Sequence, residues 1–201
     1  MAKKPLTDAE EVEVASAHEL RDWLAQNHTR DRGVWLVSFK KADPERYLSV
    51  GEIVDQCLCF GWVDSLTRSK DDLRSMLWIS PRKKGSNWSR VNKEKVARLE
   101  AEGLMAPPGR AVIERAKADG TWTALDEVEN LVIPSDLQAA FDQNPGSEET
   151  WQAYPRGVKR GALEILLNAK RAETRARKIA EIIDCAKAGE RPFQWRGPKG
   201  R

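Results

Sequence analysis

The segment SVGEIVDQCLCFGWVDSL (residues 49–66) contains the change from helix to strand that decides the fold. It opens with a capping box, Ser49 with Glu52, and continues with apolar residues at helical spacing. Gly61 is a residue type suited to the left-handed end of a helix. The following Trp62–Leu66 is short, with aromatic and β-branched residues, which predicts a strand. We therefore expect a helix that ends near Gly61 and leads directly into a sheet.

The neighbouring segments predict a small, largely antiparallel sheet with helices before and after it. Gly33–Phe39 and Leu73–Ser80 have strand patterns, and the polar stretch Arg68–Asp72 predicts a hairpin turn. A helix is expected after Ser16, which has Glu19 as its capping partner. Further helical patterns lie at 88–102 and 108–119, and a weaker capping box pairs Thr7 with Glu10.

From residue 135 onward only helices are predicted. Ser135 and Gln138 give another capping box. The expected helices are 135–142, 145–153, 156–170 and 172–188. The fold class is therefore α+β, with N-terminal helices and a small sheet followed by an all-helical C-terminal part. The expected domains are 1–130 (α+β) and 133–190 (helical), with a mobile basic tail at 191–201.

Composition excludes several classes of protein. The longest apolar runs, such as Cys57–Val63, fall far short of the ~20 residues of a membrane span. Eight Trp, four Phe and two Tyr are too many aromatic residues for a disordered chain. The charged N-terminus lacks the apolar core of a secretory signal, and the three cysteines suit a reducing compartment, so we expect a cytoplasmic location.

The net charge of +3 conceals two basic blocks. Residues 68–98 contain ten basic and three acidic side chains, and residues 151–201 contain thirteen and five. The rest of the chain is acidic in sum. The small net charge therefore does not exclude binding to an anionic partner.

The most polar segment is SPRKKGSNWSRVN (residues 80–92), which runs from a predicted strand through a basic loop into a predicted helix. Free N–H groups and the positive end of the helix dipole favour an anion at such a junction, and three consecutive cations add charge. The spacing is not that of a phosphate-binding P-loop. The alternative is a solvated loop in which Ser86 or Asn87 caps the helix and Trp88 is a core residue.

Trp62 and Asp64 share one face of their predicted strand, because alternate side chains point the same way. Asp64 is placed to pair with Arg82 across the hairpin or to act as a general acid or base. A structural ion pair or hydrogen bond is the simpler interpretation, since no second titrating partner is visible. With the basic loop, these residues give a predicted ligand-binding groove. Its members are Trp62, Asp64, Arg82, Lys84, Ser86, Asn87 and Trp88.

A second basic segment is NAKRAETRARKI (residues 168–179). Lys170, Arg171, Arg175 and Lys178 are spaced so that most of them lie on one side of a helix or helix junction. Such a stripe can bind nucleic acid, anionic lipid or an acidic protein. It can equally be a solvated face with internal ion pairs.

The motifs of standard enzymes do not occur in the sequence. G-x-S-x-G, H-E-x-x-H and G-x-G-x-x-G are missing. His18 and His28 are not expected to hold a metal, and Cys57-x-Cys59 lacks the spacing of zinc and redox pairs. The two cysteines are better interpreted as buried apolar residues. We therefore expect no metal and no cofactor, name no catalytic residue and lean against an enzyme.

Four segments resemble the YdeI/OmpD-associated family of bacterial proteins, which are often labelled bacteriocin-protection proteins. The segments are Phe60–Asp64, Pro81–Ser89, Arg98–Met105 and Ala169–Arg177, and the resemblance extends from about His18 to Pro192. The family often has Ile where Val63 stands and Pro where Lys84 stands, which are mild departures.

The resemblance implies a bacterial protein linked to tolerance of cationic antimicrobial peptides or bacteriocins, and to an outer-membrane porin. Without an export signal, either the porin link is indirect or the family name overstates it. Direct capture of cationic peptides by the basic segments is disfavoured by like charge. We therefore expect a stress-tolerance protein that binds an anionic small molecule or an acidic protein partner. The alternatives are nucleic-acid binding by the basic C-terminal helices and an unrecognised enzyme centred on Asp64.

Overall fold

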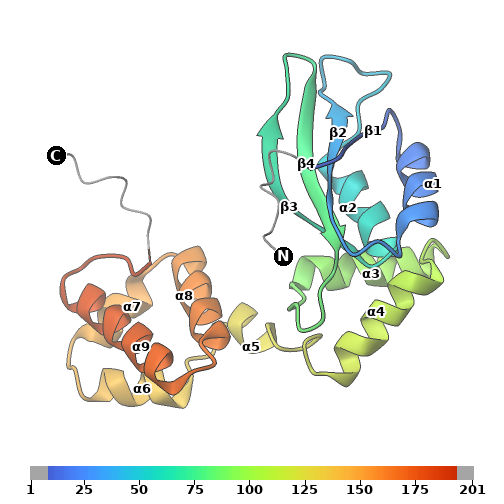
Figure 1. The fold of residues 1–201 in the computed structure, drawn as a ribbon. Coiled ribbons are helices and arrows are strands. Elements are labelled where there is room, and N and C mark those ends of the chain that lie inside the picture. Colours follow the sequence, from blue (N-terminus) through green and yellow to red (C-terminus); the bar gives the residue numbers. More distant parts are fainter. Residues whose placement is uncertain (1–8, 194–201) are drawn as a thin grey trace. The chain divides into compact units, whose positions relative to one another are not determined.

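The computed structural model describes residues 9–193, which form two compact units divided between Thr123 and Ala124 (Figure 1). The first unit combines a sheet with helices. In the second, the regular elements of the described residues are all helices. This is the α+β architecture that the sequence predicts, with the sheet first and the helical part last.

Within the described residues, a four-stranded sheet forms the centre of the first unit. Its strands are β1 (Glu11–Glu13), β2 (Val34–Phe39), β3 (Trp62–Ser69) and β4 (Arg74–Pro81), in the order β1-β2-β4-β3. β4 pairs antiparallel with both β2 and β3, whereas β1 runs parallel to β2. The sequence does not predict β1, because Glu-Val-Glu has no strand pattern and the strand depends on its pairing with β2.

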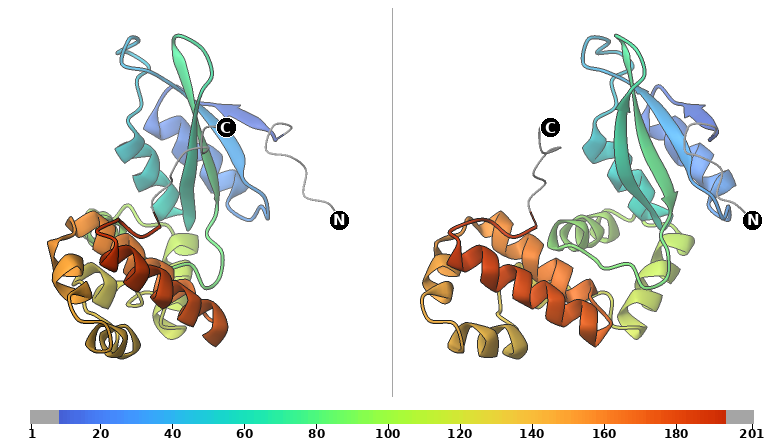
Figure 2. Two further views of the ribbon diagram at one scale, coloured as in Figure 1. Left: turned by 90° about the vertical axis from the view of Figure 1, so that its left-hand side faces the viewer. Right: turned by 60° about the vertical axis from the view of Figure 1, so that its left-hand side comes forward.

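Helices α1 (Ala17–Asn27) and α2 (Val50–Cys59) pack on one face of the sheet (Figures 1 and 2). Leu24 from α1, Ile53 from α2 and Leu36 from β2 belong to the same apolar core and are almost completely buried. Burial of an aliphatic side chain of this size stabilises a fold by about 1.5–3 kcal/mol. The core therefore lies between this helix pair and the sheet.

The start and end of α2 agree with the sequence prediction. The Ser49 hydroxyl accepts a hydrogen bond from the Glu52 amide at 3.2 Å, and the Ser49 amide donates to the Glu52 carboxylate at 3.0 Å. This reciprocal pair is a complete capping box. Gly61 follows with a φ of +74°, which glycine adopts without strain, and the chain enters β3 at the next residue.

Two further helices complete the first unit, α3 (Arg90–Ala101) and α4 (Pro107–Ala118). Gly109 allows α4 to approach the end of α2 closely. A Cβ atom added at Gly109 would lie 2.2 Å from the Cys59 carbonyl oxygen, so no other residue fits without movement of the backbone. This contact fixes α4 beside α2.

The second unit is built from helices around its own apolar core. The helices are α5 (Asp126–Glu129), α6 (Ser135–Asp142), α7 (Ser147–Ala153), α8 (Arg156–Asn168) and α9 (Ala172–Lys187). Phe141, Trp151, Leu163 and Ile182 are nearly fully buried in that core. No helix among the described residues is long and apolar enough to cross a membrane.

Two predicted helix caps are wrong, although the predicted bounds of α6, residues 135–142, agree with the structure. Ser135 is the first residue of α6 rather than its cap, because the extended backbone of Pro134 already ends the preceding segment. α3 is capped by Ser89, not by Ser86 or Asn87. Thr7 of the predicted N-terminal capping box, and the predicted tail beyond residue 193, lie outside the described residues.

Candidate functional site

The basic loop that the sequence singles out connects β4 to α3, so the predicted strand–loop–helix junction is present. At its far end the Ser89 hydroxyl accepts a hydrogen bond from the Asn92 amide at 3.3 Å, which satisfies one N–H of the first helical turn. Lys83 and Lys84 are exposed, whereas Arg82 and Trp88 are buried. The loop therefore has an exposed cationic centre between two buried anchors.

Arg82 is the unusual anchor, because a charged side chain is 93% removed from solvent with few partners. Its Nη1 donates to the Asn87 carbonyl oxygen at 3.1 Å, and its guanidinium lies 3.9 Å from the centroid of the Trp88 ring. Burial lowers the pKa of Arg82 to about 10, and the negative charge of Asp64 opposes that shift. Arg82 is therefore still a cation at neutral pH.

Two hydrogen-bond donors at this anchor have no acceptor among the described residues. They are Nε of Arg82 and Nε1 of Trp88, and both are buried. A buried donor without an acceptor costs roughly 1–3 kcal/mol, so such groups are rare in native proteins. Both donors belong to the stacked Arg82–Trp88 pair, which makes this anchor the candidate position for a bound acceptor.

A cavity of about 10 Å³ lies between the loop and the end of α4. That volume is close to the minimum that holds one water molecule. The charged or hydrogen-bonding side chains in its lining are Arg82, Lys83, Lys84, Ser86, Trp88, Arg115, Asp119 and Thr121. Positive charge therefore dominates the wall.

Asp119 is the only carboxylate among the described residues of that lining. Its Oδ1 accepts hydrogen bonds from the amide and the hydroxyl of Thr121, at 3.1 and 2.5 Å. These bonds lower the pKa of Asp119, and the charges of Lys84 and Arg115 lower it further. Asp119 is therefore ionised, and the lining still has an excess of positive charge because four cations face this one carboxylate.

Asp64 does not pair directly with Arg82 in the described structure, contrary to one sequence interpretation. The register places Asp64 opposite Ile79 and Trp62 opposite Pro81, so Arg82 lies beyond the last pair of the ladder. The Arg82 amide instead donates to the Gly61 carbonyl oxygen at 2.9 Å. Asp64 is half-buried and acts on Arg82 only through its charge.

Trp62 is a core residue. It is 1% exposed, its ring lies 5.5 Å from that of Trp23, and its Nε1 donates to the His28 carbonyl oxygen at 3.4 Å. Of the seven predicted groove residues, the cavity lining contains Arg82, Lys84, Ser86 and Trp88 but not Trp62, Asp64 or Asn87. Asn87 supports the site through its carbonyl oxygen, which accepts from Arg82.

Sequence reasoning missed the residues that α4 and the following turn bring to the cavity. Arg115, Asp119 and Thr121 lie some thirty positions after the loop, and no pattern in the sequence connects them to it. Only the packing of α4, which depends on Gly109, places them there.

The predicted basic helix surface divides into paired and unpaired cations. Arg175 of α9 donates twice to the Asp136 carboxylate and once, at 2.7 Å, to the Leu166 carbonyl oxygen. The ion pair raises the pKa of Arg175 and lowers that of Asp136. Lys178 pairs with Glu181 at 3.0 Å. Lys170 and Arg171 are exposed and make no side-chain ion pair within residues 9–193.

The cysteine thiols give no sign of a reactive site. Cys57 and Cys59 are buried, and Cys185 is partly exposed. Burial raises the pKa of Cys57, so its thiol stays protonated and unreactive at neutral pH. Within residues 9–193, no group of three or more His, Cys, Asp or Glu side chains is placed to hold a metal ion.

Comparison with known families gives one match in each of the two structural units. Residues 12–112 match the family described as Domain of unknown function (DUF8412), and residues 130–189 match the family described as Bacteriocin-protection, YdeI or OmpD-Associated. No curated protein and no solved structure was found to match the chain. The first match lies within the first structural unit and the second within the helical unit.

Proposed function

Because the chain belongs to the DUF8412 family and has the YdeI/OmpD-associated domain in its helical unit, we propose that it is a bacteriocin-protection protein that acts by binding an anion at the Arg82–Trp88 loop. The observation that carries this proposal is the pair of buried donors, Arg82 Nε and Trp88 Nε1, beside a cavity with a cationic wall. An acceptor bound to either donor removes the energetic penalty of leaving that group unpaired.

The charge of the lining favours an anion over a neutral acceptor. Arg82, Lys83, Lys84 and Arg115 contribute positive charge, while Asp119 is held by Thr121. Arginine and lysine side chains are usual components of phosphate and carboxylate sites. The proposed ligand is therefore an anionic small molecule or a carboxylate or phosphate group on an acidic protein partner.

Entry of a phosphate-sized ion requires the exposed centre of the loop to move, because the cavity itself has only the volume of a water molecule. Gly85 has a φ of +79°, and a Cβ atom added there would have no heavy atom within 4 Å, so nothing packs against the loop at this point. Arg82 and Trp88 stay fixed by burial. In this proposal residues 83–86 move away from α4 to admit the ion. Arg82 and Trp88 remain in place and donate hydrogen bonds to it through Nε and Nε1.

This site cannot capture a cationic peptide, because like charges repel. Protection against bacteriocins is therefore proposed to act through an anionic ligand or acidic partner in the cytoplasm. Association with a porin rests on the family description alone.

The experiment is a titration with inorganic phosphate and sulfate, followed by thermal unfolding and by amide NMR signals. Binding at ten times the dissociation constant should raise the free energy of unfolding by about 1.4 kcal/mol. The signals of residues 83–88 and 115–121 should shift. Lys84→Ala combined with Arg115→Ala should abolish the response, whereas the control Arg32→Ala removes an exposed charge elsewhere in the first unit and should leave it intact. No response to either ion, which is the result expected if only water fills the cavity, contradicts the proposal.

A nucleic-acid function for the helical unit is the second candidate, and the exposed Lys170 and Arg171 are the observation that favours it. Two phosphate contacts predict that the logarithm of the binding constant falls with the logarithm of salt concentration with a slope of about −2. Charge removal at both residues should flatten that slope. Absence of retention on DNA and RNA at low salt excludes this candidate and leaves the first untouched.

A further inference from the structure

A second hollow of the first unit lies far along the sheet from the Arg82 loop, at the opposite end of β4. It has a volume of about 290 Å³, at the lower end of the roughly 300–1,000 Å³ typical of small-molecule sites. Its floor is apolar, with Leu48, Ile53 and Leu77 all nearly fully buried. We refer to this hollow, lined by residues of 38–53 and 67–77, as the hairpin groove.

Hydroxyl groups from three neighbouring strands line one side of the hairpin groove. Ser38 of β2 is paired in register with Ser75 of β4, and Thr67 of β3 is paired with Leu77. The described side-chain hydrogen bonds include none from these three hydroxyls, and Ser38 Oγ is not among the fully buried polar atoms that lack a partner. Strand alternation places Ser38 on the same face as Leu36, so a polar group interrupts the apolar face of β2 where the groove begins.

The rim of the groove is cationic. Lys40 and Lys41 line it together with Tyr47, and none of its described lining residues is acidic. Lys40 is engaged, because its Nζ donates to the Asp71 carbonyl oxygen at 2.6 Å and to the Ser69 hydroxyl at 3.3 Å. Lys41 is exposed and lies 5.8 Å from the centroid of the Tyr47 ring, so its ammonium group is available to a ligand.

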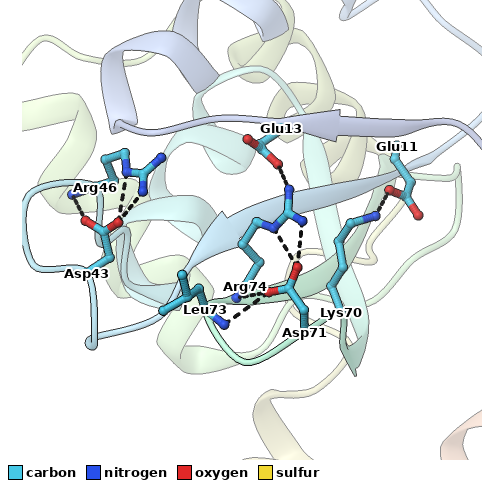
Figure 3. Close-up of polar contacts among 8 residues, drawn as sticks. All are labelled: Glu11, Glu13, Asp43, Arg46, Lys70, Asp71, Leu73 and Arg74. Atoms are coloured by element: carbon cyan, nitrogen blue, oxygen red, sulfur yellow. Dashed lines mark hydrogen bonds and ion pairs between the residues drawn. The ribbon is translucent and has the colours of Figure 1, made fainter.

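Ion pairs hold the surroundings of the groove in place (Figure 3). At the hairpin tip, Arg74 pairs with Asp71 at 2.6 Å and with Glu13 of β1, and Lys70 pairs with Glu11. In the 40–48 loop, Arg46 pairs with Asp43.

Arg46 also lies over the Phe39 ring, 3.9 Å from its centroid. These contacts engage the carboxylates of Glu11, Glu13, Asp43 and Asp71 with cations other than Lys41. Preformed walls with an uncompensated lysine at the rim are what a ligand site requires.

We infer that the hairpin groove binds a small organic anion, a carboxylate with an apolar body. The apolar body packs on Ile53 and Leu77, the hydroxyls of Ser38 and Ser75 bind a polar substituent, and Lys41 binds the carboxylate. The described lining residues offer no carboxylate to a cationic amine, and Lys40 and Lys41 would repel it. The apolar floor distinguishes the groove from the proposed inorganic-anion site at Arg82.

The test is an NMR titration of the full chain with benzoate and hexanoate, with benzylamine and hexylamine as matched cations. Both carboxylates should shift the amide signals of residues 38–41, 47–53 and 75–77, and the amines should not. Lys41→Glu should weaken carboxylate binding roughly tenfold, because the variant loses an exposed ion pair with the ligand and replaces it with repulsion. The control Lys187→Glu makes the same charge change on exposed α9 and should have no effect.

A second variant blocks the groove without touching its charge. Thr67 is exposed on β3, where an aromatic residue is tolerated, so Thr67→Phe should fold normally and abolish carboxylate binding. Equal shifts with amines, no shift at the groove, or unchanged binding by Thr67→Phe would each overturn the inference. Phosphate should shift the signals of residues 83–88 and not those of the groove, so failure here and failure of the Arg82 site are distinguishable.

Discussion

Arg82 and Arg175 both stand out in the sequence, and their surroundings in the fold differ in the number of acceptors. Arg175 has three hydrogen bonds, two to Asp136 and one to Leu166, while 28% of its side chain is exposed. Arg82 has one side-chain hydrogen bond, to a carbonyl oxygen, and is almost completely buried. The pKa of Arg175 is raised by its ion pair, and that of Arg82 is lowered by burial.

This difference is the basis for our proposal that Arg175 is a structural cation and Arg82 a binding cation. A charge that is removed from water destabilises a fold unless partners compensate for the lost hydration. Arg175 has those partners and connects three helices. Arg82 has fewer partners, with a single side-chain hydrogen bond, and we propose that a bound anion compensates for its lost hydration.

The largest expected effect concerns the packing that forms the Arg82 cavity. Gly109→Ala should lower the free energy of unfolding of the first unit by about 3 kcal/mol, because the new Cβ collides with the Cys59 carbonyl oxygen. It should also abolish the phosphate response, since α4 supplies one wall. Unfolding followed by amide signals resolves the two units.

Gly161→Ala in α8 is the matched control, because no heavy atom lies within 4 Å of a Cβ at that position. It should stabilise the second unit by about 0.5–1 kcal/mol through the higher helix propensity of Ala. Equal and small effects of the two substitutions would show that the close approach of α4 to α2 is not required.

Arg175→Ala should destabilise the second unit by about 2 kcal/mol, because it removes charged hydrogen bonds that join α9 to α6 and α8. Arg177→Ala changes an exposed arginine of the same helix and should alter stability by less than about 0.5 kcal/mol. Denaturant unfolding measures both. Similar losses in the free energy of unfolding for the two variants would show that Arg175 has no special structural role.

The ion pair also predicts a dependence of stability on pH. The pKa of Asp136 is lower in the folded state than its ordinary value near 4, so its contribution is present above about pH 4 and is lost as the pH falls through the folded-state pKa. Asp136→Asn should therefore cost about 1 kcal/mol at pH 7, since the carboxylate is partly exposed, and the cost should shrink as the pH falls below about 4. A difference that stays constant from pH 7 to pH 2 contradicts this assignment.

Local signals in the sequence are sufficient to predict most helices and strands of the fold. The Ser49–Glu52 box and Gly61 define the bounds of α2, and apolar periodicity defines the helices of the second unit. β1 escapes prediction because a polar three-residue strand exists only through its parallel pairing with β2.

The candidate sites are harder to predict, because they depend on contacts between distant segments. Arg82 and Lys84 stand out as part of a basic loop, but the unpaired donors and the contribution of Arg115 appear only once α4 is packed. The sequence does not predict the hairpin groove. Ser38 is a small polar residue in an apolar strand, and the pairing that brings it beside Ser75 cannot be read from either strand alone.

Among the variants of the two compared arginines, Arg82→Met should change stability less than Arg175→Ala. An apolar side chain of similar length replaces a buried charge that has few partners, so stability should change by less than about 1 kcal/mol or increase. Thermal unfolding of the first unit measures the change. A loss near 3 kcal/mol or more, roughly the cost of breaking a buried pair, would mark Arg82 as a structural residue like Arg175.

The most direct measurement is the phosphate titration of Arg82→Met beside the unchanged protein and Arg82→Lys, read from the amide signals of residues 83–88 and 115–121. We predict that the unchanged protein responds, that Arg82→Lys responds weakly because lysine keeps the charge without the Nε donor, and that Arg82→Met is folded and silent. A folded Arg82→Met protein that binds phosphate as tightly as the unchanged protein would contradict the assignment of the anion site to Arg82.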